Sequence, residues 1–475
     1  MASNLPDYVA SARPVPAANR IAWYKSTAQT YAGIMLWFVF WTAVPAGEGT
    51  PGGTLAHGLG PAFLGLIAAA LLCHFLYYLA PGLLGMKTGL PLYIVGTSTY
   101  GVLGGFILPG FLMGLLQFGW LGVNAFFSGQ ALVAPFGIAA GAPVHLIVAS
   151  LFAVAAAFMG LKGIQYVARV ASFLPLIPLA ILLILFFASV GGVGSFDPQK
   201  AVDAQLAAAK AAPGAAPAAA LTQWGVIAML LIYVIGFFAT AGAAGADFGM
   251  NNRDAKDVQL GGLVGIAGAT IFAGGLALLI VAGAHGAGSA PAGVFQATAL
   301  MDGIVGKTPA AIFNWLLAVA AFPPACFSAF IAANSFKTTL PKVNPFVSVG
   351  LGTLGSIILV VTGFAGKAAD VFTIIGASFG PICGAMAADY LLAGKKWAGP
   401  RAGFNPAGWV SWAVGFIVGA AKFIGLGAFV PVPPLSAFVV GFVLYYALAK
   451  AGMVSQTLSM PAGEKPQAEI EAAAR

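Results

Sequence analysis

The chain has 475 residues, of which 60% are hydrophobic and only 7% are charged, and its formal net charge is +8. Soluble domains carry roughly a quarter charged residues, so this composition excludes a soluble globular protein. The apolar runs are about 20 residues long and do not alternate, which excludes a membrane β-barrel. We therefore expect an all-α protein that crosses the membrane many times.

Twelve apolar stretches are long enough, or nearly so, to cross a bilayer, which needs roughly 20 residues. Residues 1–30 precede them, are polar and show no cleavable leader pattern, so we expect a cytoplasmic N-terminal tail. The expected spans are 31–47, 61–83, 102–132, 143–160, 164–192, 223–246, 259–285, 309–333, 346–365, 370–393, 406–429 and 434–452. Residues 453–475 form an expected cytoplasmic tail, disordered after about Ser455.

The basic residues favour one side of the predicted membrane. With the N-terminus inside, the cytoplasmic connections hold most loop cations: Lys87, Lys162, Arg253, Lys256, Lys337, Lys342, Lys395, Lys396 and Arg401. The outer connections hold fewer, among them Lys200, Lys210, Lys307 and Lys367. This bias predicts a multi-pass protein of the cell membrane with both termini in the cytoplasm. It also accounts for the positive net charge without a nucleic-acid partner.

The longest outer connection, residues 193–222, divides the chain and carries no assigned chemistry. The first five spans fill residues 31–192, the next five fill 223–393, and residues 394–452 hold two more. Two stretches, Phe40 to Gly47 and Phe238 to Gly245, both read F-x-T-A-x-x-A-G. Matching interrupted helices in two halves indicate a transporter's substrate site. Ala and Gly are abundant here, so chance is the competing explanation.

The third span carries Gln117, Trp120 and Asn124 on one helix face, because their offsets are three and seven residues. Gln can offer a donor and an acceptor to a planar heterocycle, and Trp can stack on its face. The alternative is that the amides bond a neighbouring helix and the Trp fills space. The face therefore predicts either a ligand site or a helix contact.

Other polar features are less specific. Pro323 and Pro324 in the eighth span free backbone carbonyls for a cation or substrate, or simply kink the helix. Asp247 and Asp389 lie near cytoplasmic span ends, beside Arg253 and Lys395, which favours salt bridges or helix-end contacts over a proton relay. The cysteines suit buried thiols. The sequence has no Walker loop, zinc motif or nucleophile elbow, which argues against an ATP-driven pump or a metalloenzyme. We predict no catalytic residue and no metal site.

Together these stretches resemble the nucleobase–cation symporter family, the purine/cytosine permeases, and are closest to the bacterial cytosine permeases. The motifs that carry the resemblance are GMKTGL at 85–90, QFGWLGV at 117–123, ADF at 246–248, PICG at 381–384 and ADY at 388–390. The resemblance covers nearly all twelve spans. It implies a LeuT-type five-plus-five inverted repeat with two additional C-terminal helices. It also implies alternating access around a site between the first, third, sixth and eighth helices.

Carried over by position, the resemblance implies that Gln117 and Trp120 contact the substrate, that Phe238 sandwiches a base and that Thr240 lies beside it. Trp41 would be the first-helix aromatic. The full set of substrate candidates is Gln117, Trp120, Phe238, Thr240, Trp41, Asn124 and Cys326, and the ion candidates are Trp37, Phe40 and Ser328.

The eighth helix departs from the sodium-coupled members, which place ion-binding hydroxyls there. This chain has Pro324 and Ala325 at the nearest positions, with Ser328 a turn later. The prolines resemble fungal members, which use protons. The expected coupling cation is therefore a proton or sodium, and we favour the proton.

The sequence thus predicts a secondary active transporter that imports a nucleobase (cytosine or a purine) or a related small heterocycle by cation symport. We expect a lipid bilayer around it, no cofactor and no obligate protein partner. An amino-acid or amine carrier of the same fold is the alternative, since fold does not fix substrate. A membrane-embedded channel or enzyme is a further alternative, against which stands the lack of a filter-like repeat or an acid–base pair.

Overall fold

The computed structural model describes residues 5–211, 219–291, 293–427 and 429–460. This part of the chain is almost entirely helices and short connections, and its extended pairings are two isolated bridges. Nine helical stretches among the described residues are long and apolar enough to cross a membrane. A bent pair makes a tenth, and two shorter apolar helices bring the count to the twelve expected. The protein is an all-α polytopic membrane protein.

The spans follow the predicted order. The bent pair is α2 (Thr27–Met35) with α3 (Phe38–Ala43), and the shorter helices are α19 (Pro345–Val361) and α21 (Pro406–Gly419). The others, in chain order, are Leu59–Thr88 (α4, η5, α5), Thr97–Phe136 (α7, η6, α8, η7), Pro143–Lys162 (α9), Ile164–Ser195 (α10, α11, η8), Gln223–Ala243 (α13), Ala255–Gly286 (α15, η9, α16), Lys307–Thr339 (α18), Ala368–Leu392 (α20) and Pro433–Lys450 (α22). Within them, α4 is Leu59–Leu72, α5 is Leu79–Thr88, α7 is Thr97–Gly105, η6 is Phe106–Phe111, α8 is Leu112–Val133, α15 is Ala255–Gly262, η9 is Leu263–Gly268 and α16 is Ala269–Gly286.

The helices pack as two groups that repeat after five spans. The first group, α8, α9, α18 and α19, contains the third and fourth spans of each half, and its core is largely alanine. The second group contains the first and second spans of each half: α2 packs on η9 and α15, α4 on α13 and α16, and α5 on α14 (Gly245–Gly249) and α15. Helix α20 packs on α13, α21 and α22. This pairing of equivalent spans is the arrangement expected of an internal repeat.

Both spans with the matching stretches are interrupted. The first span bends by 47° between α2 and α3, just before the Phe40 to Gly47 stretch, where Trp37 has non-helical backbone angles (φ −59°, ψ 124°). The sixth span is interrupted at Ala244, between α13 and α14. In the eighth span α18 continues as one helix through Pro323 and Pro324. Proline removes an amide donor without always ending a helix in a membrane, where neighbouring helices hold it in place.

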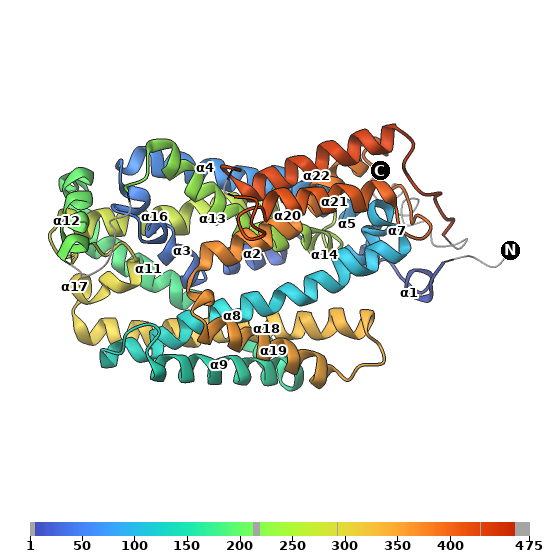
Figure 1. Ribbon diagram of the computed structural model, residues 1–475. Helices are drawn as coiled ribbons and strands as arrows, with labels where there is room; N and C mark the ends of the chain where they lie inside the picture. Colours follow the sequence, from blue (N-terminus) through green and yellow to red (C-terminus); the bar gives the residue numbers. More distant parts are fainter. Residues whose placement is uncertain (1–4, 212–218, 292, 428, 461–475) are drawn as a thin grey trace.

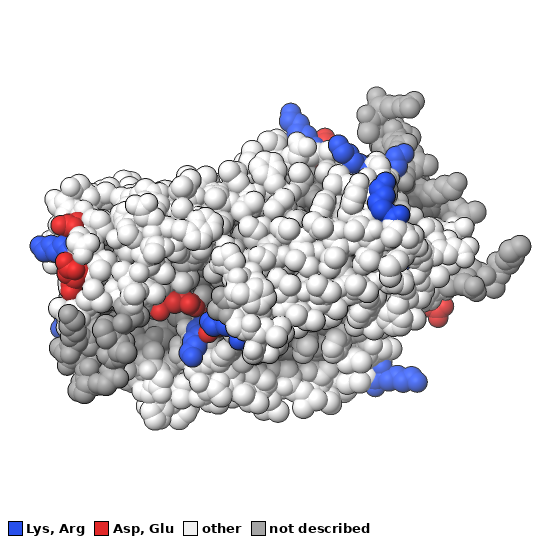
Figure 2. Space-filling model, turned by 45° about the horizontal axis from the view of Figure 1, so that its top comes forward, with Lys and Arg blue, Asp and Glu red and all other residues white. Residues whose placement is uncertain are grey.

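The molecule has two distinct ends (Figure 1). At the α1 end lie α1 (Asp7–Ala10), α7 and the C-terminal end of α22, and at the α12 end lie α12 (Pro198–Ala211) and α17 (Met301–Val305). Figure 2 shows basic and acidic side chains toward both ends of the visible face and a wide charge-free belt over much of its middle. Such a belt suits contact with hydrocarbon.

Candidate functional site

Six aromatic rings gather where the first span bends. This aromatic cluster consists of Trp37, Phe40, Trp120, Tyr233, Phe237 and Phe372. The rings come from the bend between α2 and α3, from α3, α8 and α20, and twice from α13. The cluster therefore joins both packing groups and α20, so a ligand held there would touch every part of the bundle.

The ring of Trp120 contacts three other rings of the aromatic cluster. Its centroid is 5.0 Å from that of Phe372, 5.2 Å from that of Phe237 and 6.0 Å from that of Trp37. The Phe237 contact is edge to face, at 83°. Trp120 is only partly buried, whereas Phe237 and Phe372 are almost fully buried. The surface of Trp120 left uncovered is of the kind on which a planar ring can stack.

Polar atoms beside these rings have spare bonding capacity. The indole Nε1 of Trp37 is buried and has no hydrogen-bond partner. The amide of Gln117 is 7% exposed and donates only to the Met113 thioether, at 3.7 Å. Trp120 Nε1 donates to Thr240 Oγ1 at 3.3 Å. Buried donors are normally satisfied, so the open indole N–H and the weakly bonded amide are groups that a polar ligand could still bond.

The structure brings Trp120 and Thr240 together, with Gln117 one turn before Trp120 on the same face of α8, but it places Trp41 and Phe238 outside the aromatic cluster. Trp41 is fully buried and its Nε1 donates to Leu36 O at 3.1 Å, which satisfies a carbonyl beside the bend. Phe238 lies against Tyr31 with ring centroids 5.6 Å apart. The ring in the aromatic cluster is that of Phe237, one residue earlier, because consecutive helical residues point about 100° apart.

Asn124 and Cys326 hold helices together within the first packing group. Asn124 Nδ2 donates to Ala321 O of α18 at 3.1 Å, and its Oδ1 accepts from Ser128 at 2.9 Å. Cys326 is fully buried where α18 meets α9, and a Cβ added to Gly160 would lie 2.4 Å from its carbonyl oxygen. Their contacts are with protein, so their predicted role in substrate binding gains no support from geometry.

The oxygens expected to hold an ion are partly occupied. Trp37 O accepts from Phe40 N at 3.0 Å, and Phe40 O accepts from the Tyr233 hydroxyl at 3.2 Å. The same hydroxyl lies 3.0 Å from Val39 O. Ser328 is buried in α18, which packs on α8 and α9, while α3 packs on α16. The one proton of the Tyr233 hydroxyl is thus shared between two backbone oxygens of α3, one of them that of the ion candidate Phe40.

A cavity of about 480 Å³ lies on the α12-end side of the aromatic cluster and shares Tyr233 with it. It is also lined by Phe127, Gln296 and three charged residues, Glu48, Lys367 and Asp370. Figure 2 shows acidic and basic side chains gathered in a hollow of the surface. The volume lies within the range of small-molecule sites, roughly 300–1,000 Å³. The cavity therefore borders the aromatic cluster at Tyr233.

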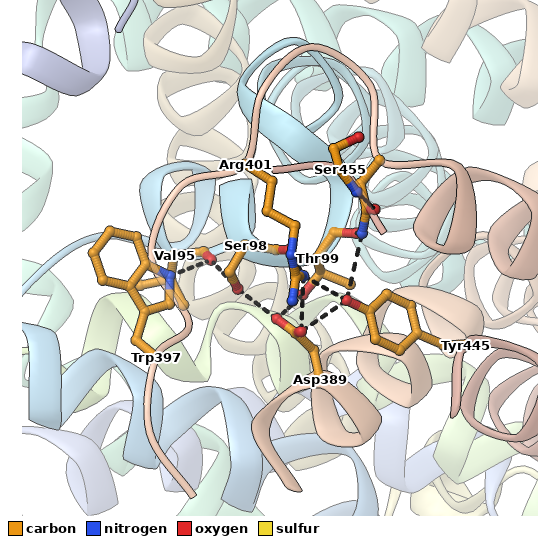
Figure 3. Close-up of polar contacts among 9 residues, drawn as sticks. Val95, Ser98, Thr99, Asp389, Trp397, Arg401, Tyr445 and Ser455 are labelled. Atoms are coloured by element: carbon orange, nitrogen blue, oxygen red, sulfur yellow. Dashed lines mark hydrogen bonds and ion pairs between the residues drawn. The ribbon is translucent and has the colours of Figure 1, made fainter. Parts of the chain in front are cut away.

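At the α1 end, polar side chains form a buried hydrogen-bonded network instead of lining a cavity. Asp389, near the end of α20, accepts from Arg401 Nη1 at 2.9 Å, from the Tyr445 hydroxyl at 2.7 Å and from Ser98 Oγ at 2.6 Å (Figure 3). Arg401 also donates to Ser98 O, and Trp397 Nε1 donates to Val95 O, three residues before Ser98. These contacts tie α7, α20 and α22 together. The salt bridge predicted for Asp389 is present, with Arg401 rather than Lys395.

Asp247 makes a second polar contact at the α1 end, with the segment just before α7. Its Oδ1 accepts from Leu92 N, at the start of α6 (Leu92–Val95), at 2.9 Å. Burial raises the pKa of Asp247 to about 6, although the Leu92 bond acts in the opposite direction. The predicted neighbour Arg253 pairs with Asp257 at 2.6 Å instead. Asp247 therefore has a structural contact and no ion pair among those found in the described residues.

No family model and no curated protein sequence matches this chain. Among solved structures it is similar to an inward-facing conformation of Mhp1, with 15% identity over 100% of this chain and 99% of that chain and a TM-score of 0.67. It is similar to Mhp1, a nucleobase-cation-symport-1 family transporter, in a closed conformation with bromovinylhydantoin bound, at 17% identity, 97% and 98% coverage and TM-score 0.61. A Na⁺-coupled sialic acid symporter, substrate-bound and outward-open, matches at 16% identity, 93% and 92% coverage and TM-score 0.52. The chain therefore has the LeuT-type fold, a five-plus-five inverted repeat followed by two C-terminal helices.

Proposed function

We propose that this protein is a secondary active transporter of the nucleobase–cation symporter family, which imports a nucleobase or a related small heterocycle. The observation that carries the proposal is the open indole N–H of Trp37 and the weakly bonded Gln117 amide beside the partly exposed ring of Trp120. Stacking and two amide-type hydrogen bonds are what a flat heterocycle with ring N–H and C=O groups requires. The full-length similarity to Mhp1, crystallised with a hydantoin, supports this class of ligand.

The same observation separates this proposal from an amino-acid or amine carrier. A charged amine or carboxylate needs an opposite charge or several aligned dipoles to leave water. The groups at the aromatic cluster are rings, an amide, a hydroxyl and an indole, and the charged side chains lie in the cavity toward the α12 end. An uncharged ligand therefore suits the aromatic cluster better.

For the coupling cation we propose the proton. The Tyr233 hydroxyl lies 3.0 Å from Val39 O and 3.2 Å from Phe40 O, so its one proton competes with a cation for these two oxygens. The eighth helix offers no hydroxyl at Pro324 or Ala325. Glu48 and Asp370 line the cavity and are the carboxylates through which a proton could enter from the α12 end. We also propose that the α1 end is cytoplasmic, as the positions of the basic residues predict.

Uptake of labelled cytosine, adenine, uracil, allantoin and hydantoins into cells that express the chain tests the proposal. We expect saturable uptake of at least one of them, which persists when choline replaces sodium and collapses with a protonophore. Uptake of none of them would contradict the substrate class. Strict sodium dependence at constant membrane potential and pH gradient would contradict the proton and would assign the ion to backbone carbonyls.

A further inference from the structure

The segment before the first span packs against the protein over most of its length. Residues 5–26, here called the strap, contain α1 and two short 3₁₀ turns, Ala17–Asn19 and Trp23–Lys25. Val9 is fully buried, and Leu5 and Arg20 are each 8% exposed. A polar tail would stay in water unless specific contacts held it, so the contacts of the strap need an explanation.

The second half of the strap is fixed to the second packing group. Arg20 Nη1 donates to Met86 O of α5 at 2.7 Å, and Val15 N donates to Gly89 O at 2.9 Å. Gly89 has φ 66°, and a Cβ there would lie 2.8 Å from Arg20 Nη2. Ile21 N donates to Asn251 O, after α14, at 2.9 Å. A buried guanidinium bonded to carbonyls is hard to move, because its donors would lose their partners.

The first half of the strap is fixed to the third span instead. The ring of Tyr8 lies 5.2 Å from that of Phe106 and 6.3 Å from that of Tyr93, and its hydroxyl donates to Val102 O. Val102 lies in α7 and Phe106 begins η6, which continues into α8 of the first packing group. The strap therefore bridges the two packing groups at the α1 end.

The geometry points to a latch. We propose that the strap holds the α1 end closed, and that Tyr8 must leave Val102 and Phe106 before that end opens. The direction of this motion rests on the proposed function, because alternating access requires the two packing groups to move relative to each other. Tyr8 is the point of release, since it is partly buried and carries the hydrogen bond and ring contacts to the third span, whereas Arg20 sits among several backbone bonds. The α12 end, by contrast, contains the cavity, so the two ends differ in how closed they are.

Hydrogen–deuterium exchange of the full chain in lipid nanodiscs tests the latch without any ligand. For Tyr8→Ala we expect exchange about fivefold faster or more in peptides covering 84–89 and 97–111, at the α1 end. Peptides covering 47–54 and 363–370, which border the cavity, should exchange more slowly, because the population moves toward the form closed at the α12 end. Opposite changes at the two ends are the signature of a latch.

The matched control is Tyr24→Ala, a tyrosine of the same strap that is 53% exposed, and it should change neither end. Tyr8→Phe keeps the ring contacts and loses only the hydroxyl, so it should give the same pattern at smaller amplitude. If Tyr8→Ala raises exchange everywhere, the chain is merely destabilised, and Tyr8→Phe decides. Faster exchange at both ends in Tyr8→Phe, or no change outside the strap, would overturn the latch. Loss of transport activity alone would bear only on the proposed function.

Discussion

Helix α20 has an ion pair near each of its ends, and the two pairs differ. At the α1 end Asp389 and Arg401 are 2.9 Å apart, with side chains 5% and 11% exposed. At the α12 end Asp370 and Lys422 are 2.8 Å apart, with side chains 19% and 56% exposed. Nearly equal distances thus accompany unequal burial. The comparison teaches that one end of the helix is anchored in a closed network, while the other end faces a cavity and is free to adjust.

The largest effect is expected from breaking the buried pair. Asp389→Ala removes the acceptor of Arg401, Tyr445 and Ser98 and should lower the free energy of unfolding by about 3–5 kcal/mol, because a buried charge loses its partner. Denaturant unfolding of the purified protein measures this. Asp389→Asn keeps an acceptor and should lose less. A change in Asp389→Ala no larger than that of a surface substitution would remove the contrast between the two ends.

Between the two ends lies the aromatic cluster, where Gln117→Ala should weaken binding. The ligand's polar groups would lose their amide partner, at about 1–3 kcal/mol, or roughly fivefold to 150-fold in dissociation constant. Isothermal titration with a transported heterocycle measures it, and unfolding should be unchanged because Gln117 bonds only Met113 weakly. Unaltered affinity in a well-folded variant would remove Gln117 from the site.

A smaller effect concerns the second acid at the α1 end. The pKa of Asp247, raised by burial to about 6, lies above that of an unfolded aspartate, so the folded state binds more protons between about pH 4 and pH 6. Stability from this group is present below that window and is lost as pH rises through it. Asp247→Asn keeps an acceptor for Leu92 N and should therefore unfold at a higher temperature than wild type at pH 7.5.

The unfolding temperatures of wild type and Asp247→Asn, measured against pH, should converge near pH 4. The exposed Asp302→Asn is the control and should not differ from wild type at either pH. A variant that is less stable than wild type at pH 7.5 would mean that the charge of Asp247 itself stabilises the α1 end.

The smallest effect is expected at the cavity end. Asp370→Asn breaks a largely exposed pair and should change the free energy of unfolding by about 1 kcal/mol or less, since exposed ion pairs contribute little. The same denaturant experiment measures it beside Asp389→Ala. A loss comparable to that of Asp389→Ala would show that both ends of α20 are anchored alike.

More of the fold than of the site could be predicted from the sequence. Apolar runs and loop cations gave the twelve spans, because each span must cover hydrocarbon thickness. They could not give the strap, whose polar composition resembles a free tail and whose contacts are with residues far along the chain. Nor could they show that α18 remains continuous, which depends on neighbouring helices. The described part of the predicted C-terminal tail likewise packs, with Leu458 N donating to Pro400 O.

The site prediction rests on the helix face that carries Gln117 and Trp120. Trp120 belongs to the aromatic cluster and Gln117 lies one turn earlier on the same face of α8, and their role in binding stays a prediction. Phe237 was missed in favour of Phe238, since a run of two phenylalanines does not show which one faces inward. Phe372 and Tyr233 were missed because a lone aromatic in an apolar span looks like any core residue. The hydrogen bond between the Tyr233 hydroxyl and Phe40 O, close to the bend of the first span, joins residues far apart in the sequence and could be found only from the structure.

The neighbouring pair Phe237 and Phe238 gives the most direct test of the central claim, that a flat heterocycle binds in the aromatic cluster. The measurement is the dissociation constant of a transported heterocycle for purified Phe237→Leu and Phe238→Leu, identical substitutions at adjacent buried positions. We expect Phe237→Leu to weaken binding by about 1 kcal/mol, or roughly fivefold, through loss of ring contacts, and Phe238→Leu to bind as wild type does. Weaker binding in Phe238→Leu with unchanged binding in Phe237→Leu would contradict the account and place the ligand on the other side of α13.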